Sequence, residues 1–353
     1  MMVISTVVEE TWFYACLWII AIFAILGNIV VIVVHKSSRT LRSVTSVFIK
    51  GLAVTDLLAG VALIPGMASQ SVAVKSNFWG EFYCKVIGSY FLLWTSAKAS
   101  VLILVFATTE RYFSVVHPIY HKRYFTELAA KLLLLLAWVI AVLMNLFSII
   151  ILHVEDGDCV AEWKVNNNIR DIIGIIVFLI SFFIPLILMF LAYTRMFASL
   201  RNREKRVNRV DGNGHNKSRN RIISHRIRKN IITMLFIVVC TFSVCWAPDQ
   251  LCYLLMNLEV QSFDYENSPV YPYFVILAIS NSCANPIIYS FKNKLFKDAL
   301  RKALGRRNRV QDNETSLNNV LGNGGCSITP IDTHSPPDNS VQKVNGSTEL
   351  REV

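Results

Sequence analysis

The chain has 353 residues, of which 54% are hydrophobic and 17% are charged, and its formal net charge is +11. Soluble chains average about 25% charged residues, and a soluble protein this apolar would expose large apolar surfaces to water. An evenly basic composition would indicate a nucleic-acid-binding protein, but the lysines and arginines of this chain are segregated, so no nucleic acid is expected as a partner.

Seven apolar runs follow one another, each near the roughly 20 residues that cross a bilayer as a helix. They lie at about 12–34, 45–69, 86–109, 132–152, 172–195, 231–256 and 271–290. A single run could be a buried core helix, and a membrane barrel would show weaker, alternating segments of roughly ten residues. The series predicts an all-α membrane protein, built as a seven-transmembrane helix bundle over residues 12–290.

The basic residues fall in alternate segments between these runs. When Lys50 and Arg195, near the inner ends of their runs, are counted with the adjoining segments, 30 of the 35 lysines and arginines lie on one side of the predicted membrane and four on the other, and Lys98 lies within a run. Because cytoplasmic loops carry the excess of lysine and arginine, the short N-terminus (1–11) is expected outside and the C-terminus inside.

The last part of the chain changes character twice. Residues 291–305 alternate apolar and basic side chains at helical spacing, which predicts an amphipathic helix in the membrane interface. Residues 306–353 are rich in Asn, Ser, Thr, Pro and Gly, which predicts a disordered cytoplasmic tail.

Polar side chains inside the runs need an explanation, because an ionisable group costs free energy in a membrane span. Asp56 lies in the second run and Ser100 in the third, while Asn281 and Asn285 share one helix face in the seventh. Such groups can link helices through hydrogen bonds. An aspartate among hydroxyl and amide oxygens can also bind a hard cation.

Proline residues interrupt three of the runs, at Pro185, Pro248 and Pro286. A proline inside a helix frees a carbonyl and kinks the helix, so the last three spans are expected to be bent. Bent helices occur in moving and in static membrane proteins alike. The third run ends in the pair Glu110-Arg111. Charged side chains at this position can simply anchor the end of a helix at the membrane interface.

In this order on seven spans, the motifs resemble the rhodopsin-like (class A) G-protein-coupled receptors over about residues 12–304. They are Gly27-Asn28, Leu52-Ala-Val-Thr-Asp56, Trp79-Gly80 with Cys84, Glu110-Arg111-Tyr112, Trp138, Pro185 with Tyr193, Cys245-Trp246-Ala247-Pro248, and Asn285-Pro286-Ile287-Ile288-Tyr289. Each motif is weak alone, but the ordered set is very specific. The resemblance implies a plasma-membrane receptor that binds an extracellular ligand and activates heterotrimeric G proteins as helices five and six swing outward.

The resemblance also implies roles for single residues. It implies a disulfide between Cys84 and Cys159, with the other cysteines free. A sodium pocket, the one place where an allosteric ion is expected, is formed by Asp56, Ser100, Asn281, Ser282 and Asn285. Activation and G-protein coupling are assigned to Glu110, Arg111, Tyr112, Val101, Pro185, Tyr193, Phe242, Trp246, Pro248, Pro286 and Tyr289. The ligand pocket is assigned to Leu93, Trp94, Ala97, Asp249, Gln250 and Tyr253.

Residues 291–305 resemble the family's eighth helix, and receptor kinases and arrestin are implied partners of the tail, whose serines and threonines fit a solvated linker equally well. One departure concerns the third span. From Cys84 to Arg111 the sequence advances 27 residues, where the family usually has 25. Since two residues turn a helix by about 200°, the register of the outer half of this span stays open.

A few residues bear on the ligand. Ile279 occupies the place of the Schiff-base lysine of opsins, and residues 91–100 lack the acid of aminergic receptors, so light and monoamines are disfavoured. Asp249 lies three residues after Trp246, on the same helix face. It either receives a cationic group of the ligand or is a structural, hydrogen-bonded aspartate. Lys98 could pair across the bundle, reach for the interface, or bind an anionic ligand.

The predicted outer surface carries 11 acids against four bases, which would attract a basic ligand. A basic neuropeptide is therefore the predicted ligand, and a small amine-like or lipid-like molecule is the alternative. A more distant alternative is a transporter or channel with Asp56 on its ion path. An enzyme is not expected, because no nucleophile–base pair, metal-ligand cluster or phosphate-binding loop is found in the sequence.

Overall fold

The computed structural model describes residues 11–38, 41, 43–69, 74–162, 166–210, 215–258 and 268–303. All of these described residues belong to one compact unit. Nearly all of the predicted N-terminal segment and the whole of the predicted tail lie outside the described residues.

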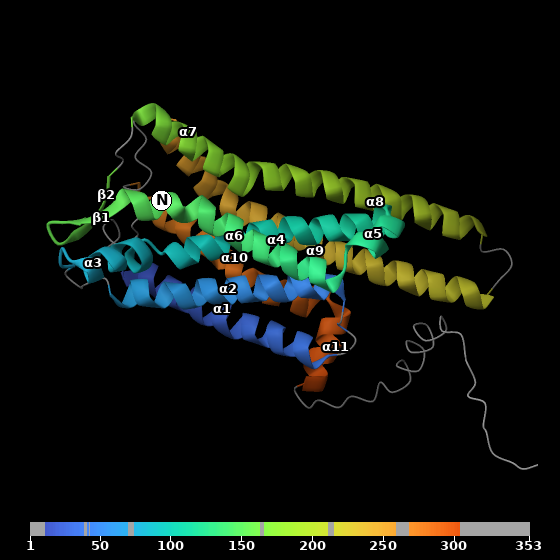
Figure 1. The fold of residues 1–353 in the computed structure, drawn as a ribbon. Helices are drawn as coiled ribbons and strands as arrows, with labels where there is room; N and C mark the ends of the chain where they lie inside the picture. The colour runs from blue at the N-terminus through green and yellow to red at the C-terminus, as the bar shows by residue number, and fades with distance from the viewer. Residues whose placement is uncertain are drawn as a thin grey trace, which may run out of the picture. The chain divides into compact units, whose positions relative to one another are not determined.

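Seven helical stretches in the described part are long and apolar enough to cross a membrane, and each matches one predicted run (Figure 1). The single-helix spans are α1 (Thr11–Ser37), α2 (Val44–Ala68), α6 (Glu127–Ile151), α9 (His215–Asn257) and α10 (Tyr271–Lys292). The third span joins α3 (Phe78–Phe82), the π-helix η2 (Tyr83–Gly88) and α4 (Phe91–Val116). The fifth joins α7 (Asn167–Phe178), the π-helix η3 (Leu179–Phe183) and α8 (Ile184–Val210).

Local sequence explains several helix starts. The side chains of Ser43, Thr126 and Asn166 accept hydrogen bonds from backbone N–H groups three residues ahead, at 3.2, 3.2 and 3.0 Å. These caps satisfy donors that a helix start leaves open. The short helix α5 (Pro118–Tyr124) begins with a proline, which needs no N–H partner there.

Apolar side chains cover the outside of the bundle. The helix α4 packs against α2, α6 and α8, and large apolar side chains face away from the bundle. Phe23 is 63% exposed, Leu143 62% and Phe190 60%. Such side chains would be unfavourable in water, but they suit contact with lipid tails.

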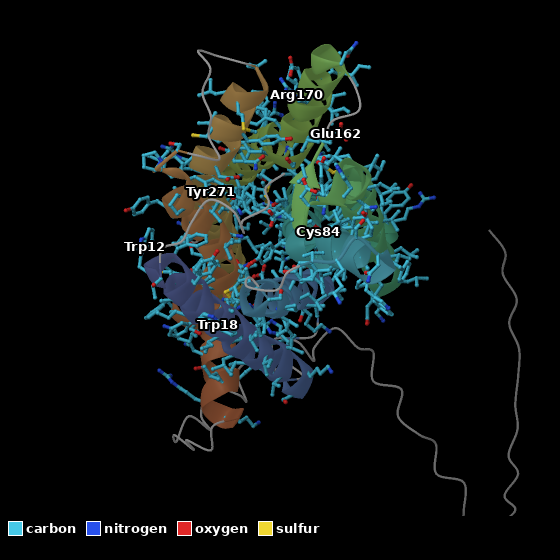
Figure 2. All side chains as sticks on the ribbon, turned by 90° about the vertical axis from the view of Figure 1, so that its left-hand side faces the viewer. Trp12, Trp18, Cys84, Glu162, Arg170 and Tyr271 are labelled. Carbon is cyan, nitrogen blue, oxygen red and sulfur yellow. A yellow bond between two sulfur atoms is a disulfide. The ribbon has the colours of Figure 1, made fainter. Side chains whose placement is uncertain are left out.

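A β-hairpin marks one end of the bundle, which we call the hairpin end; α5 marks the opposite end, the α5 end (Figure 1). The strands β1 (Leu152–Glu155) and β2 (Asp158–Ala161) are antiparallel. Asp156 and Gly157 turn the chain with φ of 49° and 92°, values that tight hairpin turns require. Figure 2 looks onto this end, with Cys84 among the helices.

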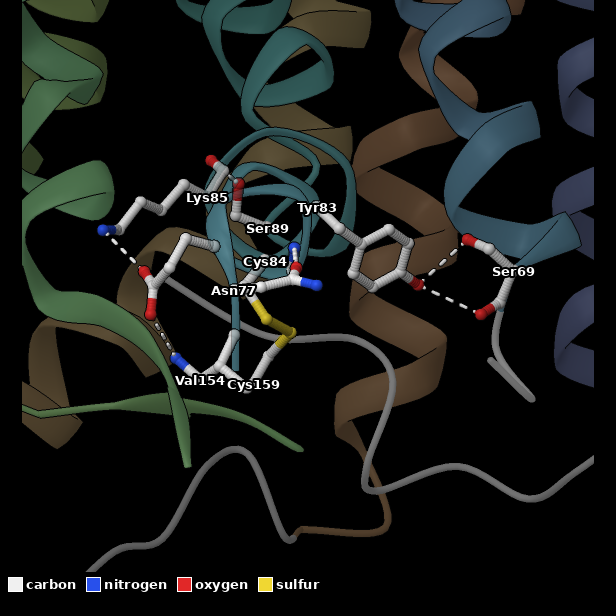
Figure 3. Close-up of a disulfide and its surroundings, with 10 residues drawn as sticks. Ser69, Asn77, Tyr83, Cys84, Lys85, Ser89, Val154 and Cys159 are labelled. Carbon is white, nitrogen blue, oxygen red and sulfur yellow. Dashed lines mark hydrogen bonds and ion pairs between the residues drawn. A yellow bond between two sulfur atoms is a disulfide. The ribbon is translucent and has the colours of Figure 1, made fainter. Parts of the chain in front are cut away.

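The predicted disulfide is confirmed: Cys84 on η2 is bonded to Cys159 on β2. Figure 3 shows how the surroundings hold the hairpin on span three. The Glu81 carboxylate accepts the N–H of Val154 at 3.0 Å and pairs with Lys85 at 2.7 Å. The hairpin is therefore fixed to span three both covalently and by hydrogen bonding.

The structure shows where span three takes up its two additional residues. The π-helix η2 widens the turn after Cys84, and Tyr90 then adopts a left-handed conformation with φ 51° and ψ 38°. A π-helix accommodates extra residues without ending the span. From Phe91 onward α4 is a regular helix up to Arg111, so the register left open by the sequence is set by this break.

The predicted eighth helix is confirmed as α11 (Lys294–Ala303). Its Phe296 is fully buried, with its ring 6.4 Å from that of Tyr289 and 5.7 Å from that of His35. The basic residues Arg301 and Lys302 lie in its last turn. The helix thus presents an apolar face to the bundle, as its spacing predicts.

Candidate ligand cavity and coupling residues

A cavity opens within the bundle, with about 660 Å³ of empty space that includes open solvent. Its walls come from α4 (Trp94, Ala97, Lys98, Val101), α6 (Phe147), α7 and η3 (Val177, Ser181, Phe182) and α9 (Phe242, Trp246, Asp249, Gln250, Tyr253). Among the predicted pocket residues, Leu93 is placed elsewhere: it is buried in a core cluster with Tyr90 and Met67. Leu93 therefore does not line the cavity, whereas the next residue, Trp94, does.

Aromatic rings form one side of this cavity. Trp246 meets Trp94 edge-on at 6.1 Å and lies 6.4 Å from Phe242, whose ring is 6.0 Å from that of Phe182. Phe242 and Val101 are almost fully buried. Displacing Trp246 would therefore disturb a packed chain of rings that links α4, η3 and α9.

The polar groups of the cavity lie mainly on α9. Asp249 is buried, with 3% of its surface exposed. Its carboxylate accepts a hydrogen bond from Gln250 Nε2 at 3.1 Å, and Gln250 Oε1 accepts one from the Ser181 hydroxyl at 3.4 Å. A carboxylate on the cavity wall can attract a cationic group from a ligand.

Lys98 is the second charged residue of the cavity. Its Nζ donates to Asn145 Oδ1 at 2.7 Å and lies 5.6 Å from the centre of the Phe147 ring. Asn145 in turn donates to the Phe91 carbonyl at 3.1 Å and to the Thr95 hydroxyl at 3.0 Å. Lys98 thus points across to α6.

Two residues of the predicted sodium pocket, Ser100 and Asn285, contact Asp56. The carboxylate accepts Asn285 Nδ2 at 2.7 Å and the Ser100 hydroxyl at 3.4 Å. Asn281 is buried on the same helix as Asn285. Asn28 donates to the backbone carbonyl of Ser282 at 3.0 Å. The hydrogen bonds therefore join α1, α2, α4 and α10.

The oxygen atoms of this cluster fit a hard cation. Besides the Asp56 carboxylate and the Ser100 hydroxyl, Asn28 Oδ1 is buried and has no hydrogen-bond partner among the described residues. A buried acceptor without a partner is rare. An ion could engage oxygens of this kind, and the Asn285 amide would have to turn to contribute its own.

At the α5 end, Glu110 is completely buried and surrounded by donors. It accepts two hydrogen bonds from Arg111, one from Thr45 Oγ1 at 3.0 Å, and pairs with His121 Nε2 on α5 at 2.7 Å. Tyr112 packs against His117 with ring centres 5.7 Å apart. These contacts fasten α5 and α2 to the end of α4.

Two buried tyrosines lie on the helices that end here. Tyr193 on α8 and Tyr289 on α10 are each 1% exposed. The Tyr289 hydroxyl has no hydrogen-bond partner within the described part of the chain. Since an unpaired buried hydroxyl costs free energy, an arrangement of helices that supplied a partner would be favoured at this position.

The three predicted prolines lie in α8, α9 and α10. Pro185 is the second residue of α8, which follows the π-helix η3, while Pro248 and Pro286 lie inside α9 and α10. Gly27 on α1 makes room for the Pro286 ring, whose Cγ would lie 3.0 Å from a Cβ at that position. A further proline, Pro65, lies inside α2 and was not part of the sequence prediction.

Several site residues were missed by sequence reasoning. Asn145 carried a usable signal, because it is a lone amide in an apolar run. Phe147, Val177 and Phe182 carried none, since apolar residues in a span look alike until the helices are packed. His121 also gave no signal, because its partner Glu110 lies on another helix.

Comparison with known proteins agrees with this fold and site. Residues 27–289 match the family described as "7 transmembrane receptor (rhodopsin family)", and the chain therefore belongs to this family. It is a G-protein-coupled receptor and a multi-pass membrane protein, and its relatives are receptors rather than enzymes.

The names of its relatives refer to different ligands. The chain is 32% identical to the allatostatin-A receptor of Bombyx mori over 295 residues, which cover 81% of this chain and 77% of the relative. It is 28% identical to the histamine H2 receptor of Cavia porcellus (87% and 84% covered). It is also 28% identical to the somatostatin receptor type 5 of Rattus norvegicus (79% and 73% covered).

Proposed function

We propose that this receptor binds a basic peptide from outside the cell and activates heterotrimeric G proteins in the cytoplasm. The hairpin end then faces outward at the plasma membrane and the α5 end faces inward. The observation that carries the proposal is the position of Asp249, a buried carboxylate on the wall of the cavity.

Charge supports a basic ligand. A buried aspartate in a membrane span is costly and usually functional, and a cationic group of the ligand would offset its charge. The described segments at the hairpin end also carry more acids than bases, six against three. Two of these acids have basic partners nearby, since Glu81 pairs with Lys85 and Asp171 with Arg170.

The aromatic cluster supplies a route for the signal. A ligand bound at Asp249 would lie one helical turn from Trp246, and moving Trp246 would press on Phe242 and its neighbours. Repacking there would let α8 and α9 move outward at the α5 end. Arg111 would then leave Glu110, and Tyr193 and Tyr289 would find new partners.

The buried cluster around Asp56 is proposed to bind sodium and so to favour the resting arrangement of the helices. Asp56, Ser100, Asn281, Ser282 and Asn285 would hold the ion, and its charge would compensate the carboxylate. Arrestin and receptor kinases are proposed to act on the tail after activation.

The histamine H2 relatives favour a second candidate, a receptor for a small amine. The first half of α4 carries no carboxylate, so an amine would depend on Asp249 alone. A transporter or channel would instead show uptake or conductance on expression, without G-protein activation.

The test is a screen of basic peptides and small amines against a panel of G-protein activation sensors. Activation by basic peptides that falls at least tenfold in potency with Asp249→Asn, at normal surface expression, supports the proposal. Unchanged potency would overturn the role of Asp249, and response to amines alone would overturn the peptide. Arg111→Ala should abolish coupling, and on-rates of agonists should fall as salt rises.

A further inference from the structure

Lys98 places a second charge on the same cavity, opposite in sign to Asp249 and on another helix. Lys98 belongs to α4 and Asp249 to α9, and both line the cavity. Within the described part of the chain, no carboxylate lies within 4.0 Å of Lys98 Nζ. The ammonium group therefore lies inside a membrane bundle with an amide, and not an acid, as its hydrogen-bond partner.

The surroundings hold this ammonium in place. Asn145 is fully buried, and its own N–H groups are fixed on Phe91 O and Thr95 Oγ1. Its Oδ1 is thereby aimed at Lys98. An ammonium has three donors, and Asn145 occupies one of them. The remaining donors belong to a side chain that forms part of the cavity wall, beside Ala97 and Val101.

A purely structural role does not require a charge here. A neutral amide at position 98 could donate the same hydrogen bond to Asn145, without the cost of an ion in the span. Besides its contact with the face of the Phe147 ring, an ammonium adds attraction for an anion, and hydrogen bonds to a charged group are stronger than neutral ones.

We propose that Lys98, oriented by Asn145, receives an anionic group of the ligand, so that the ligand carries a carboxylate as well as a cationic group. The proposal rests on the proposed function, because it concerns the same cavity. A ligand of this class is a dipolar molecule, such as an amino acid or a peptide end with a basic side chain next to its free carboxylate. Its carboxylate would bind at α4 and its cation at α9.

The test uses L-arginine and L-argininamide as probes on the purified full-length chain. The two probes differ only in the carboxylate, and dissociation constants follow from the rise of the unfolding temperature with probe concentration. Argininamide has the higher positive charge, so attraction to Asp249 and to the acidic surface alone would favour the amide. A preference for the acid therefore reports a cation in the cavity.

In the wild-type chain, L-arginine is expected to bind roughly tenfold more tightly than the amide, the contribution of one hydrogen bond to a charged group. Lys98→Gln, which keeps a donor for Asn145, should reduce this ratio to about one or below. Lys98→Arg should restore the preference. Lys98→Met serves as a second neutral variant and should behave as Lys98→Gln does.

Equal affinities of the wild type for the two probes would overturn the proposal, and so would a preference for the acid that survives Lys98→Gln and Lys98→Met. Asp249→Asn separates this inference from the proposed function. It should weaken both probes, the amide somewhat more because of its higher charge, and the preference for the acid should remain. If it weakens neither while the ratio still depends on Lys98, the anion site stands and the proposed cation site at Asp249 is wrong.

Discussion

Gly66 on α2 leaves the space that the ring of Tyr90 fills, at the point where span three is broken. A Cβ at position 66 would overlap Cε1 and Cζ of Tyr90 and would lie 2.8 Å from its hydroxyl oxygen. Tyr90 is 2% exposed, and its backbone is held by hydrogen bonds of 3.0 Å to Ile87 O and 3.1 Å from the N–H of Trp94. The ring therefore has little room to withdraw.

Two opposing contributions decide whether Gly66→Ala raises or lowers the stability of the receptor. In an unobstructed helix, alanine in place of glycine stabilises by roughly 0.5–1 kcal/mol. Overpacking a buried site costs roughly 1–3 kcal/mol, and here the obstacle is a ring fixed by a left-handed backbone. We expect a net loss of about 1–2 kcal/mol, which lowers the unfolding temperature by roughly 2–8 °C at 2–4 °C per kcal/mol.

The assay is thermal unfolding of the purified receptor in detergent, with Gly51→Ala on the same helix as control. The two atoms nearest a Cβ at position 51 would be the methyl carbons of Leu134, which can rotate away, so this variant should lose less stability. Tyr90→Leu in the Gly66→Ala background should cost less than the sum of the two single changes. A Gly66→Ala receptor that is as stable as wild type, or more so, would refute the placement of Tyr90 and the break before α4.

Three further outcomes follow from the site. Glu110→Gln removes the charge that holds Arg111 and His121. Each charged hydrogen bond lost contributes about 1.5–3 kcal/mol, so ligand-free G-protein activation should rise. Unchanged basal signalling at equal surface expression would contradict this. Cys84 and its disulfide partner are 75 residues apart, and opening a loop of this length by Cys84→Ser should destabilise the receptor by about 4 kcal/mol. A surface-expression level equal to wild type would argue against this loss of stability. Asp56→Asn should abolish any effect of sodium on agonist affinity, measured in sodium against choline chloride, and a sodium effect that persists would place the ion elsewhere.

Much of the fold could be predicted because membrane helices are specified locally. A run of apolar residues of sufficient length must satisfy its backbone hydrogen bonds within itself in lipid, so the seven runs become helices wherever they pack. The break of span three was visible only as a count of 27 residues between Cys84 and Arg111. The count could not say whether a bulge, a turn or a rotated helix would absorb the excess, because that depends on the space beside Gly66.

The sequence by itself determined the seven spans, the amphipathic α11 and, through ordered motifs, the family and the Cys84–Cys159 pair. It also placed Asp249 on the helix face of Trp246, because that relation lies within one helix. Only the tertiary structure joined Lys98 to Asn145, 47 residues away, and left Leu93 off the cavity wall. Such relations depend on how neighbouring helices are rotated against each other, and in a bundle whose spans are all apolar, packing between helices sets that rotation.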